Sequence, residues 1–135
     1  YSLVYFTYGV DCIFVFMSTT THKPDEDLEY GASFHDLSDR VKQIENVLAQ
    51  VPGEADGADW YWLCLMKNKR YGLFWGGCDY TGWDCQSNME YREAPTPKAV
   101  LSLLKENDVE DTQKPIKQQL LDQIDGKQPY ALREP

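Results

Sequence analysis

The sequence predicts an α+β domain. An antiparallel sheet of four to five strands, in ββαββ order, carries one helix packed on a face and two C-terminal helices. Three observations lead to this prediction. Apolar runs come in two pairs joined by short turns, a stretch with helical spacing lies between the pairs, and the last third of the chain contains two helix-start signals. We expect residues 1–126 to form this single domain and residues 127–135 to form a tail.

Composition and charge limit the partners. With 135 residues, 42% of them hydrophobic, the chain is long enough for one domain with its own core. Its formal net charge is -9 and its pI is near 4.6. Because nucleic-acid phosphates and anionic lipids are also negative, we expect no direct contact with nucleic acid or a membrane. A basic protein partner suits this charge. One special case is a nucleic-acid-binding protein, which the chain would bind by mimicking nucleic acid.

The first pair of apolar runs is Ser2–Thr7 and Cys12–Thr19, separated by Tyr8–Asp11. Their content of Val, Ile, Phe and Tyr around a short turn indicates a β-hairpin. The second run is almost continuously apolar, so we expect it to lie in the middle of the sheet with both faces covered. The polar stretch Thr19–Gly31, which contains an acidic cluster, indicates an exposed loop.

Ser33–Val51 carries the clearest helical pattern. Ser33 is suited to the N-cap position, and Asp36 follows three residues later, as in a capping box. Pro52 and Gly53 end the pattern. We expect this helix to dock its apolar stripe on the sheet. The stripe consists of Phe34, Leu37, Val41, Ile44, Leu48 and Val51.

The second pair of strand signals is Trp60–Met66 and Tyr71–Gly77, joined by the basic turn Lys67–Arg70. Its aromatic and β-branched content again predicts a hairpin. A further strand from Trp83 to Tyr91 would bring the sheet to five strands.

Two helices are predicted in the last third of the chain. Thr96 and Pro97 are suited to the N-cap and first position of a helix whose apolar face comes from Ala99–Leu104. Thr112 then caps a second helix, and Gly126 stands where a C-terminal cap is expected. The apolar stripe of that helix is Ile116, Leu120, Leu121 and Ile124, and the tail carries Tyr130 and Leu132 as contacts to the domain.

Cysteines and histidines match no familiar metal or catalytic spacing. Cys12 and Cys64 lie in apolar runs and are most simply small buried hydrophobes. His22 and His35 flank the acidic stretch, where a surface histidine is the simple interpretation and a metal ligand the alternative. The N-terminal run lacks the basic segment of a cleavable signal, so we expect a soluble protein in a reducing, cytoplasmic setting, without a cofactor.

The stretch Gly76–Ser87, GGCDYTGWDCQS, is the most unusual part of the chain. Its centre is nearly a palindrome around Thr81 and Gly82, and a two-residue hairpin loop there would set like residues opposite each other. Opposed cysteines can bind a soft metal or form a disulfide, and opposed carboxylates share a proton or attract a cation. The pairs would be Cys78 with Cys85 and Asp79 with Asp84.

The turn chemistry favours another register. A type I′ turn needs a positive φ at both central residues, which the β-branched Thr81 resists. Asp79–Gly82 instead fits a type I turn followed by a bulge, which shifts the pairing by one residue and lets Asp79 cap the amides of the turn. The paired metal site is therefore the less favoured alternative.

Two interpretations of the glycines in this stretch stay open. Gly76 and Gly77 can floor a small pocket walled by Tyr80 and Trp83. They can equally belong to a tight aromatic corner that returns the chain to the sheet. In the pocket, the polar contacts would be Asp79, Asp84 or Cys85.

Catalytic signals are weak. A cysteine nucleophile needs a neighbouring group that lowers its pKa, and the two histidines stand at no familiar spacing from a cysteine. The chain has no nucleophile elbow and no phosphate-binding glycine loop. We assign no catalytic residue and lean away from an enzyme.

At this motif the chain resembles small uncharacterised proteins that carry a GG-x-DYTGWDCQ segment. The resemblance covers Gly76–Gln86. It implies that the stretch is a recurring unit and brings no activity, cofactor or partner with it.

The sequence thus predicts an acidic interaction or regulatory protein that uses Tyr80, Trp83 and Asp84, beside Gly76 and Gly77, to bind a protein partner. The alternative is a small-ligand or metal-binding domain, or an enzyme, centred on the same turn. The oligomeric state stays open, because an apolar edge strand or the helix stripe can build a homodimer. The metal ligands of the alternative would be Cys78, Asp79, Asp84 and Cys85.

Overall fold

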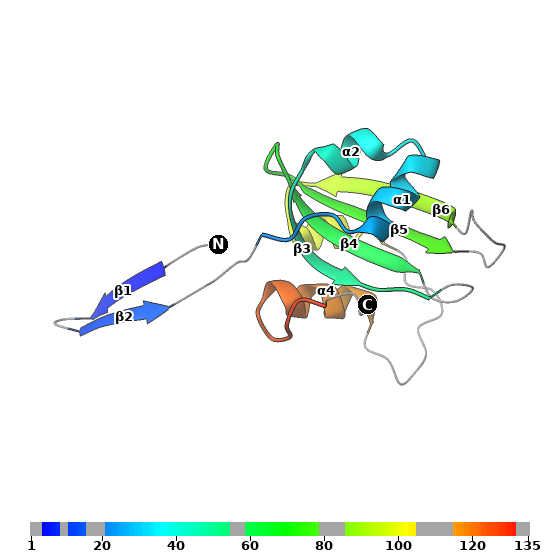
Figure 1. The fold of residues 1–135 in the computed structure, drawn as a ribbon. Coiled ribbons are helices and arrows are strands. Elements are labelled where there is room, and N and C mark those ends of the chain that lie inside the picture. Colours follow the sequence, from blue (N-terminus) through cyan, green and yellow to red (C-terminus); the bar gives the residue numbers. More distant parts are fainter. Residues whose placement is uncertain are drawn as a thin grey trace.

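The computed structural model has an α+β architecture built on a four-stranded antiparallel sheet (Figure 1). It describes residues 4–8, 11–15, 21–54, 59–78, 86–104 and 115–131. The strands of the main sheet follow one another in space as they do in the chain, in the order β3-β4-β5-β6. They are β3 (Ile44–Val51), β4 (Trp60–Met66), β5 (Tyr71–Cys78) and β6 (Gln86–Ala94).

The second predicted hairpin is confirmed. β4 has the predicted bounds, and β5 extends one residue beyond the prediction. The turn Lys67–Arg70 is closed by two backbone bonds, from Met66 N–H to the Arg70 carbonyl and from Lys69 N–H to the Met66 carbonyl, each 2.9 Å long. The further strand exists as β6, displaced toward the C-terminus.

The predicted helix over Ser33–Val51 is wrong. The chain forms helix α1 (Glu26–Phe34), the short helix α2 (Ser38–Lys42) and then strand β3. Two register shifts in the pairing of β3 with β4, one between Ile44 and Asn46 and one between Val47 and Ala49, explain the error. A bulge inserts one extra residue, so buried positions that would repeat every two residues are locally three apart. Ile44 and Val47, both buried, are therefore three residues apart, a spacing that also occurs on a helix, although the predicted stripe had continued from Ile44 to Leu48.

The acidic stretch predicted as an exposed loop instead begins a helix. The Asp25 carboxylate accepts a hydrogen bond from Leu28 N–H at 2.9 Å and caps α1. Carboxylates in the first turn are favoured there by the helix dipole. The helix ends where Asp36 takes φ = 58° and Leu37 N–H bonds the Ala32 carbonyl at 2.9 Å.

The N-terminal hairpin forms as predicted from β1 (Val4–Tyr8) and β2 (Asp11–Val15). Its predicted place in the middle of the sheet is wrong, because the two strands make a separate two-stranded sheet that Figure 1 draws apart from β3–β6. One reason is local: other parts of the chain already occupy the outer edge of β3, as described below.

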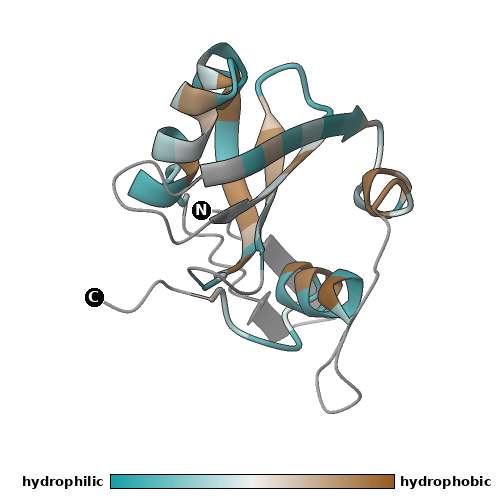
Figure 2. Cartoon of the chain, turned by 90° about the vertical axis from the view of Figure 1, so that its right-hand side faces the viewer, coloured by the Kyte–Doolittle hydropathy of each residue, from teal (hydrophilic) through white to brown (hydrophobic). Residues whose placement is uncertain are grey.

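Helices cover both faces of the main sheet (Figure 2), whereas the prediction placed one helix on a face and gave the two C-terminal helices no position. One face packs on α1 and α2, the other on α3 (Pro97–Leu101) and α4 (Ile116–Ile124). The first core contains Leu28, Ala32, Val41, Ile44, Val47, Trp62, Cys64, Met66, Phe74 and Met89. The second core contains Ala49, Leu63, Leu73, Ala94, Val100, Leu101, Leu104 and Leu120.

The two C-terminal helices have the predicted order. Thr96 Oγ1 accepts a hydrogen bond from Ala99 N–H at 3.1 Å, which confirms the N-cap. α4 begins after Pro115, and Thr112, its predicted cap, lies outside the described residues. Gly126 takes φ = 74°. The next amide, of Lys127, bonds the Asp122 carbonyl at 2.8 Å, which completes the expected glycine cap.

Candidate functional site

Gly76, predicted as the floor of a pocket, lies in a closely packed part of the sheet. It pairs with Met89 across the β5–β6 ladder. A Cβ at this position would lie 2.3 Å from the backbone oxygen of Asn88, so a side chain does not fit. The next residue, Gly77, donates its N–H to Asn88 Oδ1 at 2.7 Å. The missing side chain of Gly76 therefore makes room for strand β6.

The register changes where β5 leaves the sheet. Gly77 is opposite Asn88, and Cys78 is opposite Gln86, with a shift between the two pairs. At this position the backbone partner of Cys78 is thus Gln86 and not Cys85, unlike in the symmetric loop. The other residues predicted for this site lie outside the described residues, and their roles stay predictions. They are Asp79, Tyr80, Trp83, Asp84 and Cys85.

The described cysteine and histidine side chains are built into the fold. Cys64 is fully buried, as predicted, and burial, followed by the charge of Asp25, raises the pKa of its thiol. His22 and His35 are both half-buried: the ring of His22 packs on another ring, and His35 Nε2 is buried with no hydrogen-bond partner among the described residues. Within the described ranges, no three His, Cys, Asp or Glu side chains come close enough to hold a metal ion.

An aromatic pair on α1 was not predicted. Tyr30 is 41% exposed and Phe34 is 47% exposed, which is unusual for large apolar side chains. Their rings meet edge to face with centroids 4.8 Å apart, because residues four apart lie on one side of a helix. The opposite side of α1 buries Leu28 and Ala32 in the core.

Carboxylates precede this pair on the same helix. The first turn of α1 carries three acidic residues, and Asp25 precedes it as the cap. We call the five residues Glu26, Asp27, Glu29, Tyr30 and Phe34 the α1 surface. A sequence signal for this surface exists: Tyr30 and Phe34 are four residues apart, directly after an acidic cluster. It was missed because the cluster was predicted to lie in a loop.

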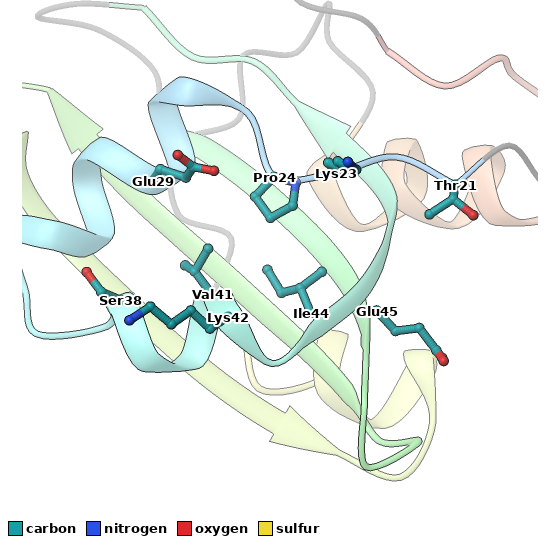
Figure 3. Close-up of a pocket in the computed structure, with 9 residues that line it drawn as sticks. All are labelled: Thr21, Lys23, Pro24, Glu29, Ser38, Val41, Lys42, Ile44 and Glu45. Carbon is teal, nitrogen blue, oxygen red and sulfur yellow. The ribbon is translucent and has the colours of Figure 1, made fainter.

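A groove lies beside the α1 surface, between α1, α2, the segment 21–24 and the start of β3 (Figure 3). Its volume is about 690 Å³. Pro24, Val41 and Ile44 line its middle, and Glu29 on α1 faces them from the side opposite Lys42 on α2.

The charges around the groove differ in their partners. Glu45 is held by Lys69 Nζ at 2.8 Å and extends away from the apolar middle (Figure 3). Lys42 Nζ lies 3.9 Å from Asp39, in a largely exposed pair of the kind that contributes little stability. Glu29 and Lys23 form no ion pair with any residue that the structure describes.

The second hollow, of about 720 Å³, lies along the outer edge of β3 between residue 22 and the C-terminal tail. The His22 carbonyl accepts a hydrogen bond from Val47 N–H at 2.8 Å, and His22 N–H donates to Asn46 Oδ1 at 2.7 Å. The His22 ring stacks on Tyr130, with centroids 3.6 Å apart and planes within 4°. Burial lowers the pKa of His22, and burial likewise raises the pKa of Tyr130.

Farther along the same edge, the side-chain amide of Gln123 takes the place of a neighbouring strand. Its Oε1 accepts from Gln50 N–H at 3.1 Å and its Nε2 donates to the Gln50 carbonyl at 2.8 Å. Gln123 also accepts from Ala131 N–H, and the Gln50 side chain donates to the Ala131 carbonyl. The contact of the tail with the domain, predicted for Tyr130, is thus confirmed and extended to Ala131.

Comparisons with known proteins give no further assignment: the chain matches no protein-family model, no curated protein and no solved structure. Among the described residues, the helices are too short or too polar for a membrane crossing. The case for function therefore depends on the α1 surface, the adjacent groove and the chemistry of the Gly76–Ser87 stretch.

Proposed function

We propose that this protein is an acidic interaction or regulatory protein that binds a basic protein partner through exposed aromatic side chains set among carboxylates. The observation that carries the proposal is the exposed, edge-to-face pair Tyr30–Phe34 on the acidic helix α1. Aromatic side chains are frequent anchors of protein interfaces, since they bury a large area with few rotatable bonds.

The charge of the chain supports a basic partner. A net charge of -9 attracts a cationic protein from a distance and raises its association rate. The carboxylates of the α1 surface then lie at the rim of the contact, where charges set orientation more than affinity. The aromatic pair supplies the apolar contact that electrostatic attraction alone lacks.

The predicted residues of the Gly76–Ser87 stretch belong to the same proposal. β5 ends and β6 begins at the end of the sheet over which α1 lies, and α1 contacts β6 (Figure 1). We therefore propose that Tyr80, Trp83 and Asp84 extend the interface beyond the α1 surface.

The alternative of a ligand or metal site within this stretch receives less support. The space above Gly76, the predicted floor of the site, is occupied by the backbone of β6.

A random peptide display library tests the proposal. Selection against the protein should enrich peptides that combine Lys or Arg with apolar residues. Replacing both Tyr30 and Phe34 by Ala should weaken binding of an enriched peptide by about 30-fold, since losing interface anchors costs about 2 kcal/mol. Raising the salt concentration from 50 to 500 mM should also weaken binding of the peptide to the wild-type protein.

Leu103→Ala is the matched control, because Leu103 is also exposed, at 50%, but lies just beyond α3 on the other side of the sheet. This variant should bind like the wild type. Enriched peptides without basic residues, or equal binding by the Tyr30→Ala/Phe34→Ala variant, would contradict the proposal.

A further inference from the structure

We propose that the groove of Figure 3 binds a peptide segment of the partner in which one apolar side chain stands between a cationic and an anionic residue. This inference rests on the proposed function and specifies which partner chemistry enters beside the α1 surface.

The middle of the groove is apolar and fixed in position. Val41 and Ile44 are each 8% exposed and belong to the core, so their place does not depend on a ligand. Pro24 faces them from the extended segment before α1 (Figure 3). A volume of about 690 Å³ is within the usual range of a site for a small molecule or a few side chains, so a short apolar side chain fits there.

Two opposite charges line the groove from different helices. Glu29 on α1 and Lys42 on α2 line the groove, and they form no ion pair with each other. Lys23 adds a second ammonium group on the segment before α1. A ligand can therefore give a cation to Glu29 and a carboxylate to the lysines, and only the weak, exposed contact of Lys42 with Asp39 must rearrange.

Uniformly charged ligands suit the groove less well. A polycationic segment satisfies Glu29 but approaches two lysines of its own sign, and a polyanionic segment meets Glu29 and the net negative charge of the chain. Glu29 belongs to both the groove and the α1 surface. A partner seated on Tyr30 and Phe34 can thus reach the groove with an adjoining segment.

Three capped nine-residue peptides test the groove, with Lys-Leu-Asp, Lys-Leu-Lys or Asp-Leu-Asp at the centre of a Gly/Ser sequence. Titration is followed by NMR of the Val41 and Ile44 methyl groups. The mixed peptide should shift these methyl signals at concentrations at least threefold lower than either uniform peptide. Free leucine, added separately, should leave them unmoved at the same concentrations.

Charge reversal should redirect the preference. Lys42→Glu should favour the Lys-Leu-Lys peptide, and Glu29→Lys should favour the Asp-Leu-Asp peptide. Lys98→Glu, an equal charge change at an exposed residue of α3, should keep the wild-type order.

Equal response to all three peptides, or shifts that avoid Val41 and Ile44, would overturn the inference. A response to free leucine as strong as to the mixed peptide would also overturn it, in favour of a small zwitterion. The experiments distinguish failure of this inference from failure of the proposed function. If Lys42→Glu leaves every peptide response unchanged while Tyr30→Ala/Phe34→Ala removes library-peptide binding, the groove is excluded and the proposed function stands.

Discussion

The two outer strands of the main sheet, β3 and β6, are protected against pairing with other chains in different ways. A strand at the edge of a sheet presents unpaired backbone groups that invite pairing with other chains. Along β3 these groups are bonded by distant parts of the chain: the His22 carbonyl takes Val47 N–H, and the Gln123 amide takes both backbone groups of Gln50. No such cover is described for β6, within the ranges that the structure describes.

Strand β6 instead carries its protection in its own sequence. Arg92 lies over the Trp75 ring, 5.7 Å from its centroid, and within 3.7 Å of Glu90. Glu93 accepts hydrogen bonds from Tyr91 at 2.6 Å and from Arg70 at 2.7 Å. Charged side chains and a register shift near the turn are common ways to discourage pairing at an edge.

The difference shows how far each edge depends on the rest of the fold. The edge of β6 depends on its own residues and on the neighbouring turn. The edge of β3 depends on residues that are 24 and 73 positions away from their partners in the chain. We therefore expect β3 to lose its protection when distant residues change, and β6 to be sensitive to changes in its immediate neighbour β5.

The largest effect should come from Gly76→Ala. Its new Cβ would lie 2.3 Å from the Asn88 backbone oxygen, and because backbone cannot turn aside as a flexible side chain does, β6 must move. We expect a loss of about 3 kcal/mol in the free energy of unfolding, measured by urea denaturation.

Gly126→Ala is the matched control for this substitution. It has nothing within 4 Å of the added Cβ, but its φ of 74° disfavours a side chain. A loss of about 1 kcal/mol is expected there. If the two variants lose the same stability, close approach of β6 is not what makes Gly76 necessary.

Gln123→Ala should have an intermediate effect at the other edge. It leaves the N–H and the carbonyl of the buried Gln50 without their partner, at a cost of about 2 kcal/mol in the free energy of unfolding. Because the edge of β3 is then open, size-exclusion chromatography should also show more self-association than for the wild type.

Gln43→Ala removes the same kind of side chain at an exposed position and should change the stability by less than about 0.5 kcal/mol. Gln123→Ala protein that is as stable and as monomeric as the Gln43→Ala control would show that β3 does not need this cover.

The smallest effect concerns the pH dependence at His22. Burial holds the folded-state pKa of His22 below the usual 6.5. The unfolded chain therefore takes up a proton first as the pH falls, so the contribution of neutral His22 is complete above pH 6.5 and is lost as the pH falls through the folded-state pKa.

His22→Phe keeps an aromatic ring against Tyr130 and the backbone bonds of residue 22 while removing the titration. Subtracting the unfolding free energies of wild type and variant at each pH cancels the carboxylates common to both. The wild type should lose stability relative to the variant between pH 7 and pH 5. A constant difference over that range would remove His22 as the titrating group.

The parts of the fold that could be predicted from the sequence have local causes. The hairpin β4–β5 was found because its strands are apolar and its turn is polar, and the cap at Thr96 was found because Thr-Pro fits one position in a helix. Strand β3 was missed because its bulges follow from pairing with β4, which the sequence of β3 does not contain. Helix α1 was missed because polar residues dominate its first turn, and its burial comes from two residues only, Leu28 and Ala32, beside a glycine.

The same distinction applies to the candidate site. Sequence reasoning singled out the stretch between β5 and β6 because its composition and near-palindromic order are unusual. It missed the pair Tyr30–Phe34 and the groove beside them, because both depend on helix α1 and on the packing of segment 21–24 against β3. The exposure of an aromatic residue is a property of its surroundings, which local patterns do not encode.

The stacking of His22 on Tyr130 has a topological consequence. It brings together two residues 108 positions apart, with ring centroids at 3.6 Å. The main sheet and the four helices that the structure describes therefore lie on a chain segment whose terminal side chains touch. Such a segment is nearly a closed ring. Because the side chains at its two ends are in contact, the segment meets the geometric condition, closely placed ends, under which domains are tolerated as insertions into a loop of another protein.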